Sequence, residues 1–247
     1  MTKVLLVGES WSTTSIHTKG FDSFITSEYS EGGDALIQIL ESADFDVTYM
    51  PSHVASSQFP YTVEELSPFD VILLSDIGAN TLLLPGSTFI KGESNPNRLS
   101  VIKDWVEKGG GFAMIGGYLS FQGIDAKANY RNTPLAQMLP VEMEIGDDRE
   151  ETPQGSKLRV VKSHQITEKV DTESPELLGY QRFTAKSEAE VLIQINDHPF
   201  LVVGKYGEGR VVAYASDIGH HWAPPSFTGW SGFREIWVNS INWLAKS

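Results

Sequence analysis

The sequence predicts an α/β protein with a doubly wound, mostly parallel sheet and an antiparallel extension. Three observations support this prediction: continuous apolar segments, amphipathic segments between them, and a later stretch in which apolar and polar residues alternate. Buried parallel strands are continuously apolar, whereas strands with one exposed face alternate. The 247 residues fit one α/β domain of roughly 200–250 residues, so we expect a single domain spanning residues 1–247.

The apolar and amphipathic segments place the expected elements along the chain. Parallel strands are expected at residues 4–7, 46–50, 71–75, 112–115 and 211–216. Helices are expected at residues 34–42, 98–108 and 232–245, where apolar side chains recur every three or four positions. Alternation of strands and helices predicts a parallel sheet covered on both faces. Residues 141–209 predict the antiparallel strands, and the acidic segment 147–154 predicts an exposed loop.

Composition and charge exclude several classes of function. The net charge of −13 and the pI near 4.8 argue against a nucleic-acid partner, which would require a basic face. The sequence contains no cysteine, so it has no disulfide, thiolate metal site or thiol nucleophile. Its first residues lack the pattern of a signal peptide, and no apolar run approaches the roughly 20 residues of a membrane span. We therefore expect a cytoplasmic protein without a membrane partner.

Ligands of open α/β sheets bind beyond the carboxyl ends of the strands. The corresponding segments here are residues 8–14, 51–57, 75–80, 116–122 and 217–222. The first is rich in hydroxyl groups and contains Glu9, Ser10 and Trp11, but it lacks the glycine spacing of a phosphate-binding loop. It is therefore expected to be a loop that forms the wall of a polar pocket.

Residues 112–123 contain the most informative motif, in which an expected strand runs into the pair Gly116 and Gly117 and then into an expected helix start. The segment resembles the nucleophile elbow of class I glutamine amidotransferases, whose pattern is glycine, apolar, cysteine, apolar, glycine, often followed by histidine and glutamine. Gly116 matches the first glycine, Gly117 the apolar position and Tyr118 the cysteine. Ser120 stands where the second glycine belongs, and Gln122 matches the glutamine.

The resemblance covers nearly the whole chain in outline and implies a flavodoxin-like, class I glutamine amidotransferase-like fold, in a divergent branch that lacks the nucleophile. It also implies an oxyanion donor near Gly78, by position alone. In the catalytic family a thiolate attacks the glutamine carboxamide with help from a histidine. A tyrosine such as Tyr118, with an ordinary pKa near 10, is a poor nucleophile at neutral pH, and Ser120 lacks the flanking glycines of an elbow serine. We expect no glutaminase activity.

The histidine partner of the family is expected after the last strand of the sheet. The usual histidine-proline-glutamate triplet is absent there, and the His198-Pro199 pair falls inside the antiparallel extension. His220 or His221 is the better match, with Asp217 available to orient it. Neighbouring residues of an extended segment point in opposite directions, so only one histidine should face the cleft. The pair could alternatively fix a loop by hydrogen bonds, or bind a metal. The tight spacing does not match common metal sites, and we expect none.

Two loop tryptophans, Trp222 and Trp230, lie among Pro, Gly and Ser residues and are expected to be less buried than those of the last helix. Such side chains can line a small-molecule pocket or form an oligomer contact. The leading hypothesis is a non-glutaminase relative that binds a small polar ligand, such as a carbohydrate, without a cofactor. Two alternatives remain. One is a hydrolase or isomerase that uses His220 or His221 as general base, and the other is a non-catalytic homo-oligomeric scaffold.

Overall fold

The computed structural model describes residues 1–171 and 173–246 and contains one eight-stranded sheet of order β4-β1-β5-β6-β14-β13-β12-β9. Its first five strands run parallel, and the last three continue it in antiparallel fashion. The predicted α/β fold is thus confirmed. The parallel strands are β4 (Asp46–Met50), β1 (Lys3–Gly8), β5 (Val71–Ser75), β6 (Gly111–Ile115) and β14 (Gly209–Tyr214). The antiparallel ones are β13 (His198–Tyr206), β12 (Glu190–Ile195) and β9 (Leu158–Val160).

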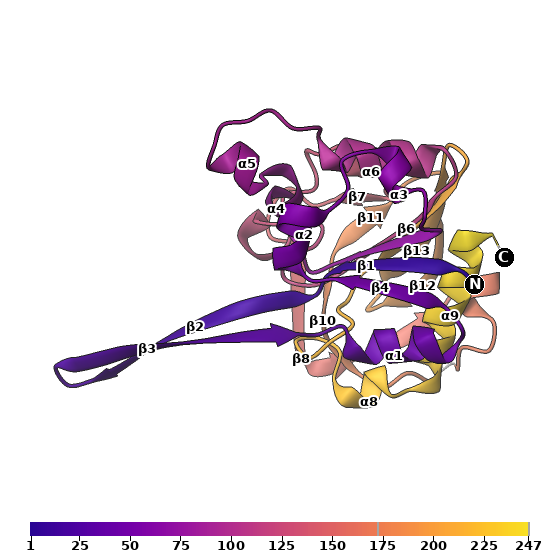
Figure 1. Cartoon of the computed structure of the whole chain (residues 1–247). Helices are drawn as coiled ribbons and strands as arrows, with labels where there is room; N and C mark the ends of the chain where they lie inside the picture. Colours follow the sequence, from indigo (N-terminus) through magenta and orange to yellow (C-terminus); the bar gives the residue numbers. More distant parts are fainter. Residues whose placement is uncertain (172, 247) are drawn as a thin grey trace.

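Helices cover both faces of the sheet (Figure 1). The predicted helices are confirmed as α1 (Asp34–Ser42), α6 (Arg98–Glu107) and α9 (Ser231–Ala245). Helix α6 covers one face, while α1 and α9 cover the other. The shorter helices are α2 (Ser52–Gln58), α3 (Val63–Leu66), α4 (Ala79–Leu83), α5 (Gly86–Phe89), α7 (Leu135–Met138) and α8 (Pro225–Thr228), with 3₁₀ turns η1 (Ile124–Ala126) and η2 (Gln165–Thr167). None of the helices in the described part of the chain is long and apolar enough to cross a membrane.

Two small antiparallel sheets flank the large one. Strand β8 (Arg149–Ser156) pairs with β10 (Leu177–Gln181), and β7 (Val141–Met143) pairs with β11 (Phe183–Ala185). The prediction of a loop at residues 147–154 is therefore wrong, because most of the segment is strand β8. Asp148 and Thr152 are buried, whereas Glu151 is exposed as expected.

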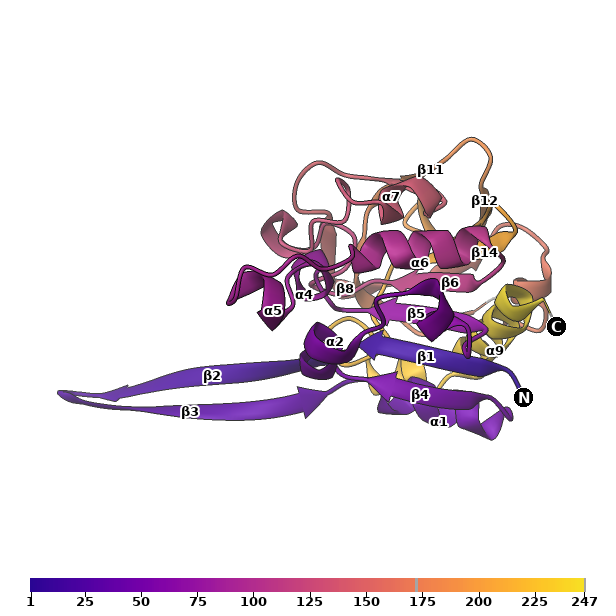
Figure 2. The same cartoon turned by 45° about the horizontal axis from the view of Figure 1, so that its top comes forward.

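A long two-stranded ribbon projects from the body of the molecule (Figures 1 and 2). It consists of β2 (Ser10–Lys19) and β3 (Asp22–Glu31), which pair along their whole length from Ser10 opposite Glu31 to Lys19 opposite Asp22. The expectation that residues 8–14 form a loop is wrong, because residues from Ser10 onward belong to this ribbon. Its many threonine and isoleucine residues favour the extended conformation.

Candidate functional site

Three carboxyl groups converge at the carboxyl edge of the large sheet. Glu9 follows β1, Asp76 follows β5 and Asp217 lies just beyond β14. Glu9 and Asp217 are each only 1% exposed. The Ser75 hydroxyl donates a 2.5 Å hydrogen bond to Glu9 Oε2, and the backbone N–H groups of Ile218 and Gly219 donate to Asp217 Oδ1 at 2.7 and 3.0 Å. The Glu9 and Asp217 carboxyls are thus held in place by local donors.

Burial and mutual repulsion change the protonation of these carboxyls. Burial raises the pKa of Glu9 well above its usual value, and the charges of Asp217 and Asp76 raise it further. Burial also raises the pKa of Asp217 and raises the pKa of Asp76 to about 6. A hydrogen bond between Glu9 and Asp217 raises the pKa of Glu9 and opposes the rise at Asp217. The two carboxyls therefore favour sharing one proton, as other buried carboxyl pairs do.

Two of these residues have strained backbones. Glu9 has φ of 49° and Asp76 has φ of 41°, in the left-handed region that costs a non-glycine residue about 1–3 kcal/mol. The Glu9 N–H donates to Ser75 O at 2.8 Å, and the Tyr49 hydroxyl donates to Glu9 O at 2.9 Å. Such strain is concentrated at functional sites, which makes this edge of the sheet the candidate site.

The structure brings His221, not His220, to the carboxyl cluster. His221 Nδ1 lies 3.8 Å from Asp217 Oδ2, and the His221 side chain is 42% exposed. Its ring lies 5.1 Å from that of Tyr118 and 5.4 Å from that of Trp11. The buried Asp217 therefore lies beneath a half-exposed imidazole that is flanked by two aromatic rings.

His220 faces a different space, a cavity of about 260 Å³ between α1, α8 and the end of the last strand. Gly32 and Gly219 also line this cavity. A Cβ atom at Gly32 would lie 2.6 Å from Glu9 Oε1, and one at Gly219 would lie 3.4 Å from it. The two glycines therefore lie between the cavity and the Glu9 carboxyl, and a side chain at Gly32 would collide with it.

The segment after β6 forms turns and the short η1, so the predicted helix start is wrong. Phe121 and Gly123 have φ of 51° and 67°, which interrupts a right-handed helix. The Asp148 carboxylate accepts hydrogen bonds from Gln122 N and Gly123 N at 2.9 and 2.8 Å. Asp148, which directly precedes β8, thus accepts hydrogen bonds from backbone N–H groups that the start of a helix would have left free.

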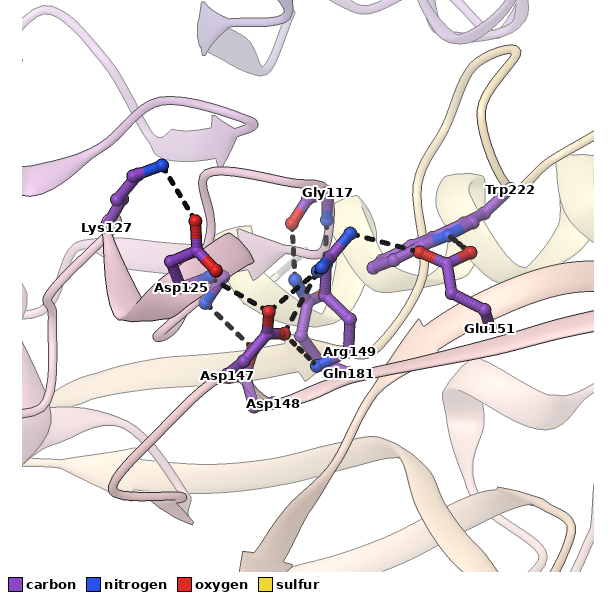
Figure 3. Close-up of polar contacts among 10 residues, drawn as sticks. Gly117, Asp125, Lys127, Asp147, Asp148, Arg149, Glu151, Gln181 and Trp222 are labelled. Carbon is purple, nitrogen blue, oxygen red and sulfur yellow. Dashed lines mark hydrogen bonds and ion pairs between the residues drawn. The ribbon is translucent and has the colours of Figure 1, made fainter.

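Other backbone donors of this segment are also occupied. Gly117 N–H donates to Gln181 Oε1 at 3.1 Å, and Gln181 Nε2 donates back to Gly117 O (Figure 3). Leu119 N–H donates to Asp76 Oδ1 at 2.6 Å. The donors that could have stabilised an oxyanion are therefore satisfied by the protein itself.

Tyr118 occupies the position of the nucleophile but is chemically unsuited to that role. Burial and then the nearby Glu151 raise the pKa of its phenol above the ordinary value, so the hydroxyl stays protonated at neutral pH. The Arg149 guanidinium lies 4.8 Å from the centre of its ring. Tyr118 is therefore an aromatic surface beside His221.

Several predicted site residues have structural partners instead. Ser120 is buried and accepts a hydrogen bond from Asp76 N. Gln122 is buried and bridges Ile145 O and Arg131 N. Gly116, also buried, has the Ala215 carbonyl and the Gln181 amide against its Cα. Ser10 accepts from Ser52 N at 2.8 Å. Gly78 precedes α4 and packs near Ala128, whose carbonyl accepts the Ala79 N–H expected to serve an oxyanion.

Trp222 is only 1% exposed, so the expectation of an exposed loop aromatic is wrong. Its Nε1 donates to Glu151 Oε2 at 3.0 Å (Figure 3), and its ring centre lies 5.6 Å from that of Tyr118. Gly179 provides the space, since a Cβ atom there would lie 2.1 Å from Trp222 Nε1. Trp230 packs against Phe227 at the edge of the core. Trp222 is therefore not available as an exposed aromatic at an interface, whereas Trp230 is partly buried.

Sequence reasoning missed Asp76, Arg149, Glu151 and Gln181. Asp76 could have been found, because it directly follows an apolar strand at the edge where ligands bind. The others lie on β8 and β10, whose pairing joins segments that are distant in sequence. Within residues 1–171 and 173–246, no cluster of three or more His, Asp or Glu side chains is arranged to hold a metal ion.

Restoring the missing thiol should not restore glutaminase activity. We expect Tyr118→Cys to release ammonia from glutamine at the rate of the buffer blank, because the surrounding N–H donors are occupied by Asp76, Gln181 and Asp148. A coupled ammonia assay with the wild type as control measures this. Glutamine turnover clearly above the blank would show that the segment still stabilises an oxyanion.

The fold and this edge of the sheet define a glutamine amidotransferase-like protein with a replaced nucleophile. The chain belongs to the family described as "Putative glutamine amidotransferase", whose sequence profile matches residues 3–246, which confirms the predicted resemblance. It is similar to the cytoplasmic protein STM1381 from Salmonella typhimurium LT2, with 47% identity, a TM-score of 0.95, and coverage of 98% of this chain and 99% of that one. The cytoplasmic protein STM3548 from Salmonella typhimurium has 44% identity, the same TM-score and 98% coverage of both chains.

A more distant likeness concerns the fold alone. A thua-like protein from Parabacteroides merdae superimposes with a TM-score of 0.57 at 14% identity, covering 99% of this chain and 90% of that one. Among curated proteins, no sequence matches this chain.

Proposed function

We propose that this protein is a cytoplasmic amidotransferase-like protein without glutaminase activity, which binds a small polar ligand of the carbohydrate class over Trp11, Tyr118 and His221. The observation that carries the proposal is the half-exposed His221 between two aromatic rings and above the buried Asp217. Aromatic faces pack against the apolar faces of sugar rings, while a few convergent polar groups fix orientation. The cytoplasmic relatives from Salmonella support the location.

Charged groups around the aromatic surface suit a ligand with several hydroxyls. Arg149 lies over the Tyr118 ring and contacts Asp147 at 2.9 Å and Glu151 at 3.2 Å (Figure 3). Carboxylates accept hydrogen bonds from hydroxyl groups, and guanidinium groups donate them. The fixed array of donors and acceptors therefore favours a neutral polyol over an anion.

A thermal-shift screen with neutral sugars, amino acids, nucleotides and glutamine tests the proposal. A ligand present at about 100 times its dissociation constant stabilises the protein by about 2.7 kcal/mol. We expect a sugar to raise the melting temperature of the wild type, and His221→Ala and Tyr118→Ala to abolish the rise.

His220→Ala is the matched control, because it removes the same kind of side chain from the neighbouring position, which faces the separate cavity. It should respond like the wild type. A response lost only in His220→Ala would place the ligand in the cavity, and a screen without any response would contradict ligand binding.

A hydrolase or isomerase with His221 as general base is the second candidate, favoured by the 3.8 Å approach of Asp217 Oδ2 to His221 Nδ1. A catalytic base needs a third group that orients it, and the buried Asp217 carboxyl is placed to orient the imidazole in this way. Turnover of a sugar found in the screen should then disappear in His221→Ala and fall in Asp217→Asn with a shifted pH profile. Binding without turnover would leave the first proposal in place.

A further inference from the structure

The β2–β3 ribbon extends away from the body with both of its faces exposed (Figures 1 and 2). From Ser12 to the turn it spans about 30 Å, at roughly 3.3 Å per residue. An isolated two-stranded hairpin is at best marginally stable in water. A ribbon of this length therefore requires a surface to pack against.

The two faces of the ribbon differ in charge. The residue pairs Thr13–Glu28 and Lys19–Asp22 place charges on one face. The other, here called the neutral face, carries no charged side chain between Ser12 and Tyr29, and Glu31 lies at its root, where it accepts a hydrogen bond from the Tyr29 hydroxyl. Ile16 lies opposite Ile25 at its centre, with exposed fractions of 72% and 65%. The neutral face comprises Ser12, Thr14, Ile16, Thr18, Ser23, Ile25, Ser27 and Tyr29.

The distribution of charge favours a second copy of the chain as the occupant. The chain has a net charge of −13, yet residues 12–27 contain only one lysine and one aspartate. Two bodies of the same sign repel each other, and the repulsion is least where the surface is neutral. The ribbon is thus the region through which two identical acidic chains approach at the lowest electrostatic cost.

The position of Ile16 fits a two-fold axis at the middle of the ribbon. Ile16 lies five residues from Trp11 at the root, whose side chain is on the charged face, and five residues from Phe21 at the tip. We propose that two copies pair through their neutral faces, with antiparallel ribbons and a two-fold axis at the Ile16–Ile25 pair. Such an isologous interface buries the same patch of both copies. It brings the fully exposed Phe21 level with the partner's Trp11, at the edge of the partner's candidate site.

This dimer does not depend on the proposed function of the cleft. Sedimentation or light scattering over a range of concentrations should give about twice the 27.3 kDa mass of the chain. Ile16→Asp places two like charges at the axis and should weaken dimerisation by about 100-fold or more, because like charges across an interface cost several kcal/mol.

Ser15→Asp is the matched control, since it adds the same charge one residue away on the opposite face, and it should remain dimeric. Both positions lie outside the body, so the melting temperature of either variant should stay close to that of the wild type. A wild type that is monomeric throughout, or two variants that dissociate equally, would overturn the proposal.

Cross-linking tests the register independently, because the natural sequence has no cysteine. A short bismaleimide should link Ile16→Cys chains into dimers but not Phe21→Cys chains, whose tips lie at opposite ends of the paired ribbons. A chain with both Ser12→Cys and Phe21→Cys should form linked dimers, since these positions are about 30 Å apart within one ribbon. Efficient linking of Phe21→Cys alone would overturn the antiparallel register.

Discussion

Replacing Arg98 with alanine is expected to lower the free energy of unfolding by about 3–5 kcal/mol, because several buried carbonyls lose a charged donor together. Arg98 is fully buried in α6. Its guanidinium donates to Leu82 O at 2.7 Å and Ser56 O at 2.9 Å, with further bonds to Ala55, Phe59 and Thr81 carbonyls. The side chain thus joins α6 to α2 and α4, and urea denaturation measures the loss.

Two further variants serve as controls, one that keeps the charge at position 98 and one that removes an exposed arginine. Arg98→Lys should recover only part of the stability, since an ammonium group cannot match the planar five-donor fork. Arg159→Ala removes an exposed arginine that pairs with Asp197 and should change the free energy of unfolding by less than about 0.5 kcal/mol. A small loss for Arg98→Ala would mean that water satisfies the exposed carbonyls.

Glu9→Gln is expected to remove much of the loss of stability that the wild type shows as the pH rises. Burial, Asp217 and Asp76 raise the folded-state pKa of Glu9 above its ordinary 4.5. The stabilisation from its bound proton is therefore fully present below about pH 4.5 and is lost as the pH rises through the folded-state pKa. Asp76, whose pKa rises from 3.8 to about 6, adds a slope of the same sign between those values.

Glutamine imitates the protonated form of Glu9, since its amide can accept from Ser75 and donate to Asp217. Urea denaturation between pH 5 and 9 should give variant and wild-type curves that meet at the acidic end and diverge above it, with the variant more stable. Glu41→Gln changes an exposed glutamate of α1 and should follow the wild type. Parallel curves for Glu9→Gln and wild type would show that Glu9 is ionised in the folded protein.

The large sheet and its three main helices could be predicted, because the spacing of apolar residues along each segment indicates which of its side chains are buried. A continuous apolar run such as Val71–Ser75 is recognisable without knowledge of its neighbours. The ribbon could not be predicted in this way, because its strands have little apolar alternation and its turn at Gly20 lacks a strong hairpin signal. Strand β8 was missed because its burial depends on β10, which is distant in the sequence.

Some residues of the candidate site could be predicted from their type and their position after an expected strand, as for Asp217, His221 and Tyr118. Its electrostatics were not, because they arise from convergence of Glu9, Asp76 and Asp217 from separate strands. The burial of Trp222 likewise depends on the space left by Gly179 and on Glu151. The amino-acid composition of a loop does not show which distant residues will pack against it.

The base of the ribbon has a consequence for divergence within the family. Gly32 N–H donates to Glu9 O at 2.9 Å, so the chain leaves the sheet and returns to it at adjacent points. Residues added or removed in opposing pairs along the ribbon would leave those points where they are, and lengthening a closed hairpin costs little loop entropy. Natural selection can therefore alter the length and surface of the ribbon while the sheet and its buried carboxyls are inherited unchanged.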